Sequence, residues 1–216
     1  MRVEIWSDVV CPWCYVGKRR FESALARFEH RDEVEVVWRS FELDPDAPRR
    51  REGSAAGHLA AKYGMSEEQV AASWARLTAL AEAEGLEYHL DRSQGGSSFD
   101  AQRLIHLGAE LGLQDRVKER FLRGYFTESL AIGDPEVLER LAVEAGLPPE
   151  RVAEVLATDR FAAEVRADEE RARRFGINGV PFFAIDERYG VSGAQSSDVL
   201  LEALDGAWRD QAVAAE

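Results

Sequence analysis

The chain has 216 residues and a formal net charge of −13, from 40 acidic and 27 basic side chains. This length can bury the core of one large domain, or of a domain that carries an insertion. A composition of 45% hydrophobic and 31% charged residues is typical of a folded globular chain. The negative surface would repel phosphate backbones and anionic lipids, so we expect neither nucleic acid nor a membrane surface as a partner.

The cellular compartment is predicted from the apolar segments. No stretch of 18 or more apolar residues occurs, so no membrane span is expected. Glu4 and Asp8 interrupt the opening residues, which therefore lack the continuous apolar segment of a secretory signal. These features predict a cytoplasmic protein. Because the cytoplasm is reducing, a purely structural disulfide is not expected there.

The first fifty residues predict a strand, a helix and a second strand. Alternating apolar residues predict strands over residues 2–7 and 34–43. Between them, a rough apolar stripe predicts a helix from about Pro12 to His30. A β-α-β order of this kind favours two parallel strands joined by a right-handed crossover.

The rest of the chain first becomes helical and then returns to strands. From about Gly57 to Phe175 the sequence is rich in Ala, Leu and Glu with helical periodicity, and glycine- and proline-containing stops divide it into several helices. After that, residues 182–185 and 189–191 predict a hairpin, and a final helix is expected over about 196–212.

The predicted fold class is therefore α/β with a large all-helical insertion. Residues 1–50 and 176–216 would form one discontinuous domain around a single sheet, with a βαβ unit from one end of the chain and a ββα unit from the other. Residues 51–175, here called the helical block, would form the inserted helical domain.

The two cysteines of the chain, Cys11 and Cys14, both lie in the short segment CPWC. Pro12 suits the first position of a helix, because it needs no N–H there and its φ is already helical. Cys11 then falls at the N-cap, where unpaired N–H groups and the helix dipole would stabilise a thiolate and lower the thiol pKa. Cys14 lies one turn deeper on the same face, placed to attack a mixed disulfide at Cys11.

Three other interpretations of the cysteine pair are weaker. Chance would give two scattered cysteines this spacing only roughly 1 time in 100. A structural disulfide that closes four residues would remove only about 2 kcal/mol of chain entropy. A zinc site needs four ligands, and the histidines are isolated from one another in the sequence: His30, His58, His89 and His106. We therefore expect no metal.

Near the other end of the chain, Pro181 opens an apparent strand, where a missing N–H is tolerated. An X–Pro bond is cis in only about 5% of cases in folded proteins, so this residue alone favours trans.

Four segments resemble the thioredoxin superfamily, and more narrowly the DsbA-like oxidoreductases of the FrnE type. They cover almost the whole chain: SDVVCPWCYVGKRRFE (7–22), FELDPDAP (41–48), the helical stretch 98–134, and FGINGVPFFAIDERYGVSGAQ (175–195). The first and last are the specific ones. The resemblance implies a thioredoxin fold with a helical insertion.

The same resemblance implies roles for individual residues. Cys11 would be the attacking thiolate and Cys14 the resolving thiol, with Pro181 in cis and packed against them. Val180 would offer its backbone to an extended substrate segment. Between the cysteines, the substrate-binding rim would include Pro12 and Trp13.

The chain also departs from the family pattern. Trp13 stands where many DsbA-type proteins carry His, which favours a milder oxidant than a CPHC enzyme. Ile5 stands where thioredoxin-like relatives often bury an acid, so the proton acceptor for Cys14 is unassigned, with Asp8 and Glu42 as candidates. Relatives lead us to expect Asn and His at two positions of the helical block that here hold other residues: Ser97 and Gln102.

These features favour a thiol–disulfide oxidoreductase that acts through a mixed disulfide at Cys11. It would bind no cofactor and would exchange with protein or small-molecule thiols and disulfides, including glutathione. An alternative is a glutathione-dependent enzyme like the 2-hydroxychromene-2-carboxylate isomerases or kappa-class glutathione transferases, which use serine at the position of Cys11. A third hypothesis is a partner-binding module whose thiols report redox state. Substrate, direction of electron flow and oligomeric state stay open.

Overall fold

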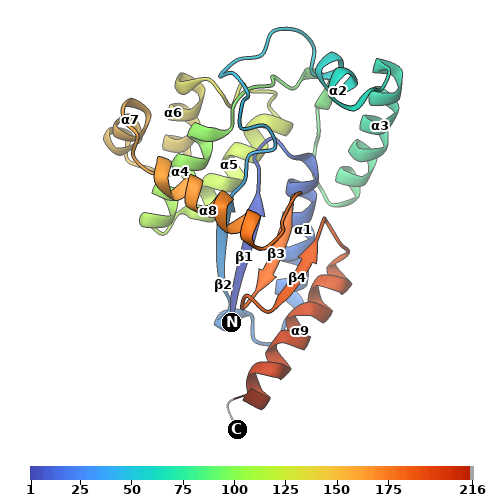
Figure 1. Cartoon of the computed structure of the whole chain (residues 1–216), viewed down its shortest axis with the longest axis vertical. Coiled ribbons are helices and arrows are strands. Elements are labelled where there is room, and N and C mark those ends of the chain that lie inside the picture. Colours follow the sequence, from blue (N-terminus) through green and yellow to red (C-terminus); the bar gives the residue numbers. More distant parts are fainter. Residues whose placement is uncertain (215–216) are drawn as a thin grey trace.

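Four strands form one mixed sheet in the order β2-β1-β3-β4 in the computed structural model, which describes residues 1–214. The first strand, β1 (Arg2–Ser7), pairs in parallel with β2 (Glu35–Ser40) and antiparallel with β3 (Phe182–Ile185). The hairpin is completed by β4 (Tyr189–Ser192). The α/β class, the parallel first pair and the hairpin are thus confirmed, and segments from the two ends of the chain share one sheet (Figure 1).

The remaining elements are helices. They are α1 (Pro12–Arg27), α2 (Ala55–Tyr63), α3 (Glu67–Ala83), α4 (Phe99–Glu110), α5 (Gln114–Phe126), α6 (Pro135–Glu144), α7 (Pro149–Ala157), α8 (Ala162–Arg174), α9 (Ser197–Ala214) and two 3-10 turns, η1 (Arg31–Glu33) and η2 (Leu90–Arg92). In the sequence, α2 to α8 all lie between β2 and β3. Figure 1 shows α4 to α7 on one side of the upper half and α2 with α3 on the other.

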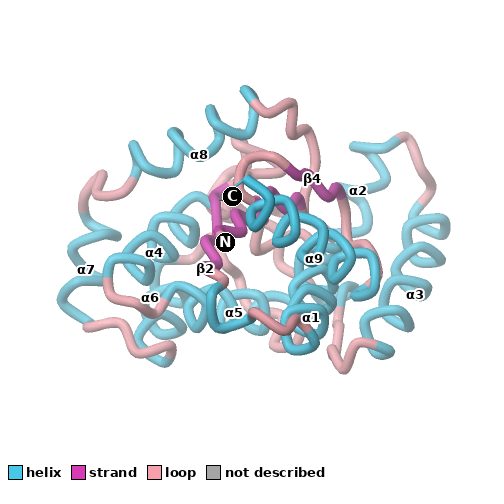
Figure 2. Tube along the Cα trace, turned by 90° about the horizontal axis from the view of Figure 1, so that it is seen from below, coloured by secondary structure: helices cyan, strands magenta, loops and turns pink. Residues whose placement is uncertain are grey.

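Alternate residues of β1 point to two differently covered faces of the sheet. Val3 and Ile5 belong to the large core shared with α1 and α9, where Phe21 stacks on Phe183 at 5.6 Å between ring centroids. Trp6 belongs instead to a small cluster with α8 and donates its Nε1–H to the Asp168 carbonyl at 3.0 Å. Figure 2 shows α8 on one face and α1 with α9 on the other. The sheet is therefore sandwiched between helices, as its period-2 pattern requires.

The outer edge of β2 is closed by a side chain of the helical block. Gln114 accepts the Trp38 N–H at 3.0 Å and donates to the Trp38 carbonyl at 2.9 Å, so its amide acts as a short piece of neighbouring strand. An unpaired strand edge can pair with another chain. The Gln114 amide prevents this at Trp38, because it satisfies both the N–H and the carbonyl of that residue. As a result, α5 is fixed to the sheet just below the CPWC segment.

Two predicted boundaries differ from those observed. The strand expected to reach residue 43 ends at Ser40, because the Leu43 N–H bonds to the Asp8 carboxylate at 2.8 Å and leaves the ladder. The helix expected to reach His30 ends at Arg27, where the backbone of Phe28 turns to extended geometry.

Candidate active site

The CPWC segment lies where the sequence predicts, at the start of α1. Cys11 is the N-cap with extended backbone (φ −91°, ψ 112°), and Pro12 occupies the first turn. The Cys11 N–H donates to the Asp8 carbonyl at 3.3 Å, and the Cys14 N–H donates to the Cys11 carbonyl at 3.0 Å. This turn holds both cysteines at one end of α1.

The cysteines are free thiols inside the protein. Cys11 is 4% exposed and Cys14 is 1% exposed, so the second cysteine is the deeper one. The Cys11 thiol donates to the carbonyl of Val180 at 3.4 Å, and the Val180–Pro181 peptide bond is cis. Residues 169 positions apart in the chain are thereby brought together.

A glycine in α1 permits this approach. A Cβ atom on Gly17 would lie 2.8 Å from Cγ of Pro181, which is closer than real Cβ contacts allow. It would also lie 3.5 Å from Cβ of Ala194, an ordinary contact distance. The missing side chain therefore lets the Pro181 ring pack directly against α1, one turn from Cys14.

The predicted lowering of the Cys11 pKa is wrong for this arrangement. A hydrogen bond with Cys14 and burial raise the Cys11 pKa above its ordinary value, and the nearby charges of Cys14 and Asp8 add to the rise. The helix N-terminus is present, as expected, but burial and these neighbours outweigh it. These surroundings therefore favour the Cys11 thiol over its thiolate.

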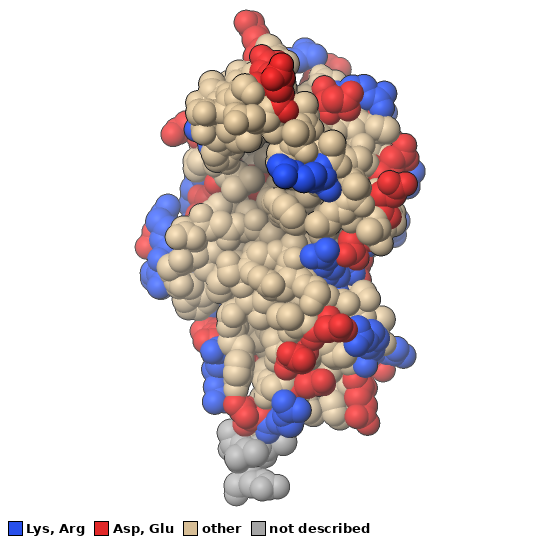
Figure 3. Space-filling model, turned by 90° about the vertical axis from the view of Figure 1, so that its right-hand side faces the viewer, with Lys and Arg blue, Asp and Glu red and all other residues tan. Residues whose placement is uncertain are grey.

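A cavity of about 410 Å³ opens beside the cysteines. One side is formed by the CPWC turn and the loop before β3, including Trp13, which is 43% exposed, and Val180. The opposite wall is formed by α2, α3, the turn between them, and α5, with the side chains Leu59, Tyr63, Met65, Val70, Trp74, Leu77, Tyr125 and Phe126. Among the described lining residues none is charged. Figure 3 shows that charged groups are sparse in the middle of the face that carries α3 and α9.

The structure separates the two candidate acids. Asp8 is buried near the cysteines, accepts the N–H groups of Val10 (3.4 Å) and Leu43 (2.8 Å), and has its pKa raised chiefly by burial. Glu42 instead bonds to Arg166 of α8 at 2.6 Å. Of the two acids, Asp8 is thus the one that lies near Cys11.

The two polar positions of the helical block have different surroundings. Gln102 is buried, and its amide donates to the carbonyls of Ser7 and Phe41, both at 3.1 Å. Ser97 accepts the Phe99 N–H at 3.2 Å and lines a second cavity. Of these two side chains, Gln102 is therefore the one that contacts the end of β1, just before the CPWC segment.

Two further side chains at the site were missed by the sequence analysis. The Tyr88 hydroxyl donates to the Pro12 carbonyl at 2.7 Å, and the Lys118 ammonium is buried below the turn, where it donates to the Ser7 carbonyl at 3.0 Å. Both belong to the helical block. A lysine on an amphipathic helix normally indicates a solvent-facing position, so the sequence pattern around Lys118 did not indicate that this side chain is buried at the site.

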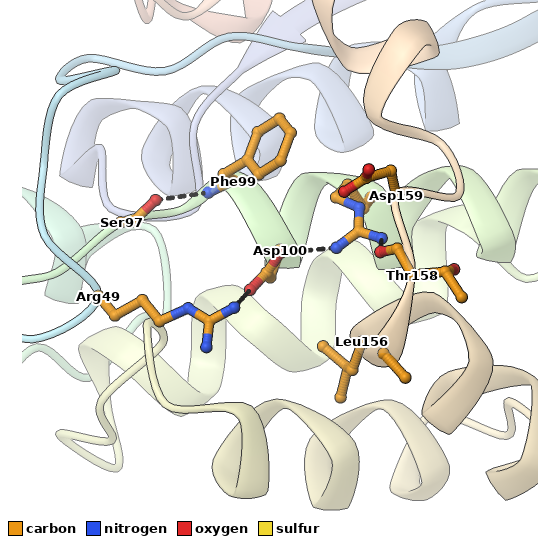
Figure 4. Close-up of a pocket in the computed structure, with 9 residues that line it drawn as sticks. Arg49, Ser97, Phe99, Asp100, Leu156, Thr158 and Asp159 are labelled. Atoms are coloured by element: carbon orange, nitrogen blue, oxygen red, sulfur yellow. Dashed lines mark hydrogen bonds and ion pairs between the residues drawn. The ribbon is translucent and has the colours of Figure 1, made fainter.

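The second cavity, of about 390 Å³, lies between α4 and α7 and is drawn in Figure 4. Its arginines are already paired: Arg103 bonds to Asp100 at 2.8 Å and to two carbonyls at the end of α7, and Arg49 lies 3.5 Å from Asp100. Arg103 therefore caps a helix end, as unpaired carbonyls require. This cavity contains neither cysteine.

Within residues 1–214, no group of three or more His, Cys, Asp or Glu side chains could hold a metal ion. In the same part of the chain, no helix is both long and apolar enough to cross a membrane.

Known proteins resemble this chain over almost its whole length. A crystal structure of a probable DsbA oxidoreductase from Streptomyces coelicolor is 52% identical and superposes with a TM-score of 0.93, over 96% of this chain and 90% of that one. The uncharacterised protein YwbO of Bacillus subtilis is 28% identical over 94% of this chain and 96% of its own length.

A more distant structure shares the fold alone. The cytosolic disulfide reductase DsbM from Pseudomonas aeruginosa, solved with glutathione, is 16% identical with a TM-score of 0.67, over 97% of this chain and 100% of that one. Residues 2–205 match the profile of the DSBA-like thioredoxin domain. The predicted thioredoxin fold is thus confirmed, and the chain belongs to the DSBA-like thioredoxin domain family of oxidoreductases.

Proposed function

We propose that the chain is a cytoplasmic thiol–disulfide oxidoreductase that works through Cys11 and Cys14. The observation that carries this proposal is the position of Cys11 at the N-cap of α1 and of Cys14 in its first turn. The Cys11 thiol is hydrogen-bonded to the Val180 carbonyl at the mouth of an uncharged cavity. A nucleophile at a cavity and a second thiol one turn deeper are the two parts that disulfide exchange needs.

The reaction has two balanced steps. The Cys11 thiolate attacks one sulfur of a substrate disulfide, the substrate S–S bond breaks, and the other sulfur leaves as a thiolate that takes up a proton. The Cys14 thiolate then attacks the sulfur of Cys11, which forms the Cys11–Cys14 disulfide and releases the second substrate thiol. Two electrons pass to the substrate, and the reverse sequence oxidises a substrate dithiol.

Substrate binding would use the residues that surround Cys11. When its sulfur forms a mixed disulfide, Cys11 no longer donates to the Val180 carbonyl, which becomes free to accept an N–H of an extended substrate backbone. Pro12, Trp13 and Pro181 would contact the same segment. The uncharged cavity favours a peptide with an apolar side chain beside its cysteine.

Glutathione is the thiol we propose for resetting the pair. Two molecules would reduce the Cys11–Cys14 disulfide and leave as oxidised glutathione, without any bound cofactor. The fold shared with a reductase solved with glutathione supports this choice.

The test is equilibration in glutathione buffers, read by mass spectrometry. The wild type should interconvert between dithiol and disulfide, Cys14→Ser should accumulate a glutathione adduct on Cys11, and Cys11→Ser should accumulate none. A wild type that shows no two-electron exchange would refute the proposal. If Cys14→Ser instead kept a glutathione-dependent isomerase activity intact, the site would be an isomerase. Partner binding that survives loss of both cysteines would indicate a binding module.

A further inference from the structure

Most groups around the two cysteines oppose the thiolate that disulfide exchange requires. The Val180 carbonyl accepts the Cys11 thiol proton, Asp8 contributes a buried carboxyl, and both sulfurs are shielded from water. Trp13, in the dipeptide between the cysteines, cannot carry a charge. The helix N-terminus therefore needs a further positive group if the site is to react near neutral pH.

Lys118 of α5 is a cation in the right place. Its side chain is 0% exposed, its ammonium donates to the Ser7 carbonyl at 3.0 Å, and it lies 5.7 Å from the centre of the Trp38 ring. Ser7 is bonded to Asp8, whose carbonyl in turn accepts the Cys11 N–H. The ammonium is thus held beneath the turn that carries both sulfurs.

The charges that face Lys118 come from three parts of the fold. Burial lowers its pKa to about 8, whereas Cys14 and Cys11 on α1 and Asp8 after β1 raise it. Lys18, also on α1, opposes them with its positive charge. Because such influence is reciprocal, the same ammonium favours the anionic form of both cysteines.

Lys118 differs from a second buried lysine, Lys18, in the groups that balance its positive charge. Lys18 is 1% exposed and lies 5.8 Å from the centre of the same Trp38 ring. Its charge is met by three carboxylates of α1 and α5: Glu22, Asp115 and Glu119. For Lys118, the groups that can carry the opposite charge are the Asp8 carboxyl and the two cysteines once ionised. A newly formed thiolate would therefore be a counter-ion for Lys118.

We propose that Lys118 is the buried cation that supports the thiolate of the Cys11–Cys14 pair, so that helix α5 of the helical block sets the reactivity of the active site. This inference rests on the proposed thiol–disulfide exchange. Lys118 is not assigned a contact with substrate; it acts through its charge. In a buried site of low dielectric such a charge acts more strongly than at the surface.

The test is the pH dependence of alkylation by iodoacetamide, in which the thiolate sulfur displaces iodide and forms a C–S bond. Lys118→Met should move the profile to higher pH and slow the reaction about tenfold at pH 7, because the thiolate fraction falls tenfold for each unit by which the thiol pKa rises. Lys18→Met, which removes an equally buried lysine, should leave the profile unchanged. Equal profiles for Lys118→Met and the wild type, or equal shifts in both lysine variants, would overturn the inference.

A second measurement does not require a lysine variant to fold. The side-chain nitrogen resonance of Lys118, followed by NMR as the pH is varied, should titrate at higher pH in the reduced wild type than in a Cys11→Ser/Cys14→Ser variant, which lacks the two anions. Identical titrations would refute the coupling. Failure of the wild type to exchange disulfides in glutathione buffers would instead refute only the proposed function, because alkylation and the lysine titration do not depend on it.

Discussion

The Tyr88 hydroxyl donates a 2.7 Å hydrogen bond to the carbonyl of Pro12, and so joins the helical block directly to the turn that holds the two cysteines. The Tyr88 ring stacks on Phe126 at 4.8 Å and on Tyr15 at 6.1 Å between centroids. Burial and the neighbouring Cys11 raise its pKa, so the phenol stays protonated and remains a donor. This contact holds the CPWC turn from a segment 76 positions away in the chain.

Tyr88→Phe should therefore weaken the turn while keeping the aromatic stack. We expect a loss of about 0.5–1.5 kcal/mol of stability, typical of one hydrogen bond, together with a several-fold slower exchange with a substrate disulfide. Thermal unfolding measures the loss of stability, and the rate of exchange with a substrate disulfide measures the second effect. Tyr189→Phe is the control, since it removes one hydroxyl bond to Asp210 at the other end of the sheet. If both variants exchange at the wild-type rate, Tyr88 has no positioning role.

The extent to which the site was predictable depends on the range of the interactions. The start of α1 was predictable because Cys11 and Pro12 are adjacent and capping is local. Lys118 and Tyr88 were not, because each meets the CPWC turn across dozens of residues and only helix packing decides which side chains become buried. The wrong direction for the Cys11 pKa has a local and a tertiary cause: the hydrogen bond with Cys14 and burial together outweigh the effect of the helix N-terminus.

Gly17→Ala should be destabilising although alanine is the better helix former. The new Cβ would lie 2.8 Å from the Pro181 ring, so either the ring or α1 must move. We expect a cost of about 1–3 kcal/mol from overpacking, larger than the gain of about 1 kcal/mol from helix propensity.

The matched control for this substitution is Gly206→Ala in α9, where a Cβ would meet no heavy atom within 4 Å among those described. That variant should be stabilised by about 0.5–1 kcal/mol. Chemical denaturation of both variants compares them directly. A stabilised Gly17→Ala protein with normal exchange rates would show that close packing of Pro181 on α1 is unnecessary.

Gln114→Leu should weaken the edge of the sheet. The substitution keeps the approximate volume but removes both amide bonds to the backbone of Trp38, at 3.0 and 2.9 Å. Leaving this part-buried strand edge unpaired costs about 1–3 kcal/mol, and the unpaired edge should also promote aggregation. Denaturation and light scattering measure the two effects. Gln94→Leu, which loses one exposed bond to the Ser129 carbonyl, should change neither.

Glu42 should make the protein less stable as the pH rises from about 5 to 7. Its carboxylate shares Arg166 with Glu169 of α8, and its Oε1 has no partner among the described residues. Burial raises the Glu42 pKa from 4.5 to about 7; Arg166 opposes this rise and Glu169 adds to it. The folded state therefore binds more protons than the unfolded state in this interval, and its stability falls with rising pH, by about 1–3 kcal/mol.

Glu42→Gln removes this titration while its amide oxygen can still accept from Arg166, so the decline in stability between pH 5 and 7 should flatten. Glu170→Gln is the control, on the helix α8 that also carries Arg166. Arg173 lowers the Glu170 pKa, so any contribution of that group to stability varies with pH only below about pH 4.5. Urea unfolding at each pH gives the three curves. If the Glu42→Gln curve keeps the wild-type slope, another group is responsible, and the contact between Glu42 and α8 does not respond to pH near neutrality.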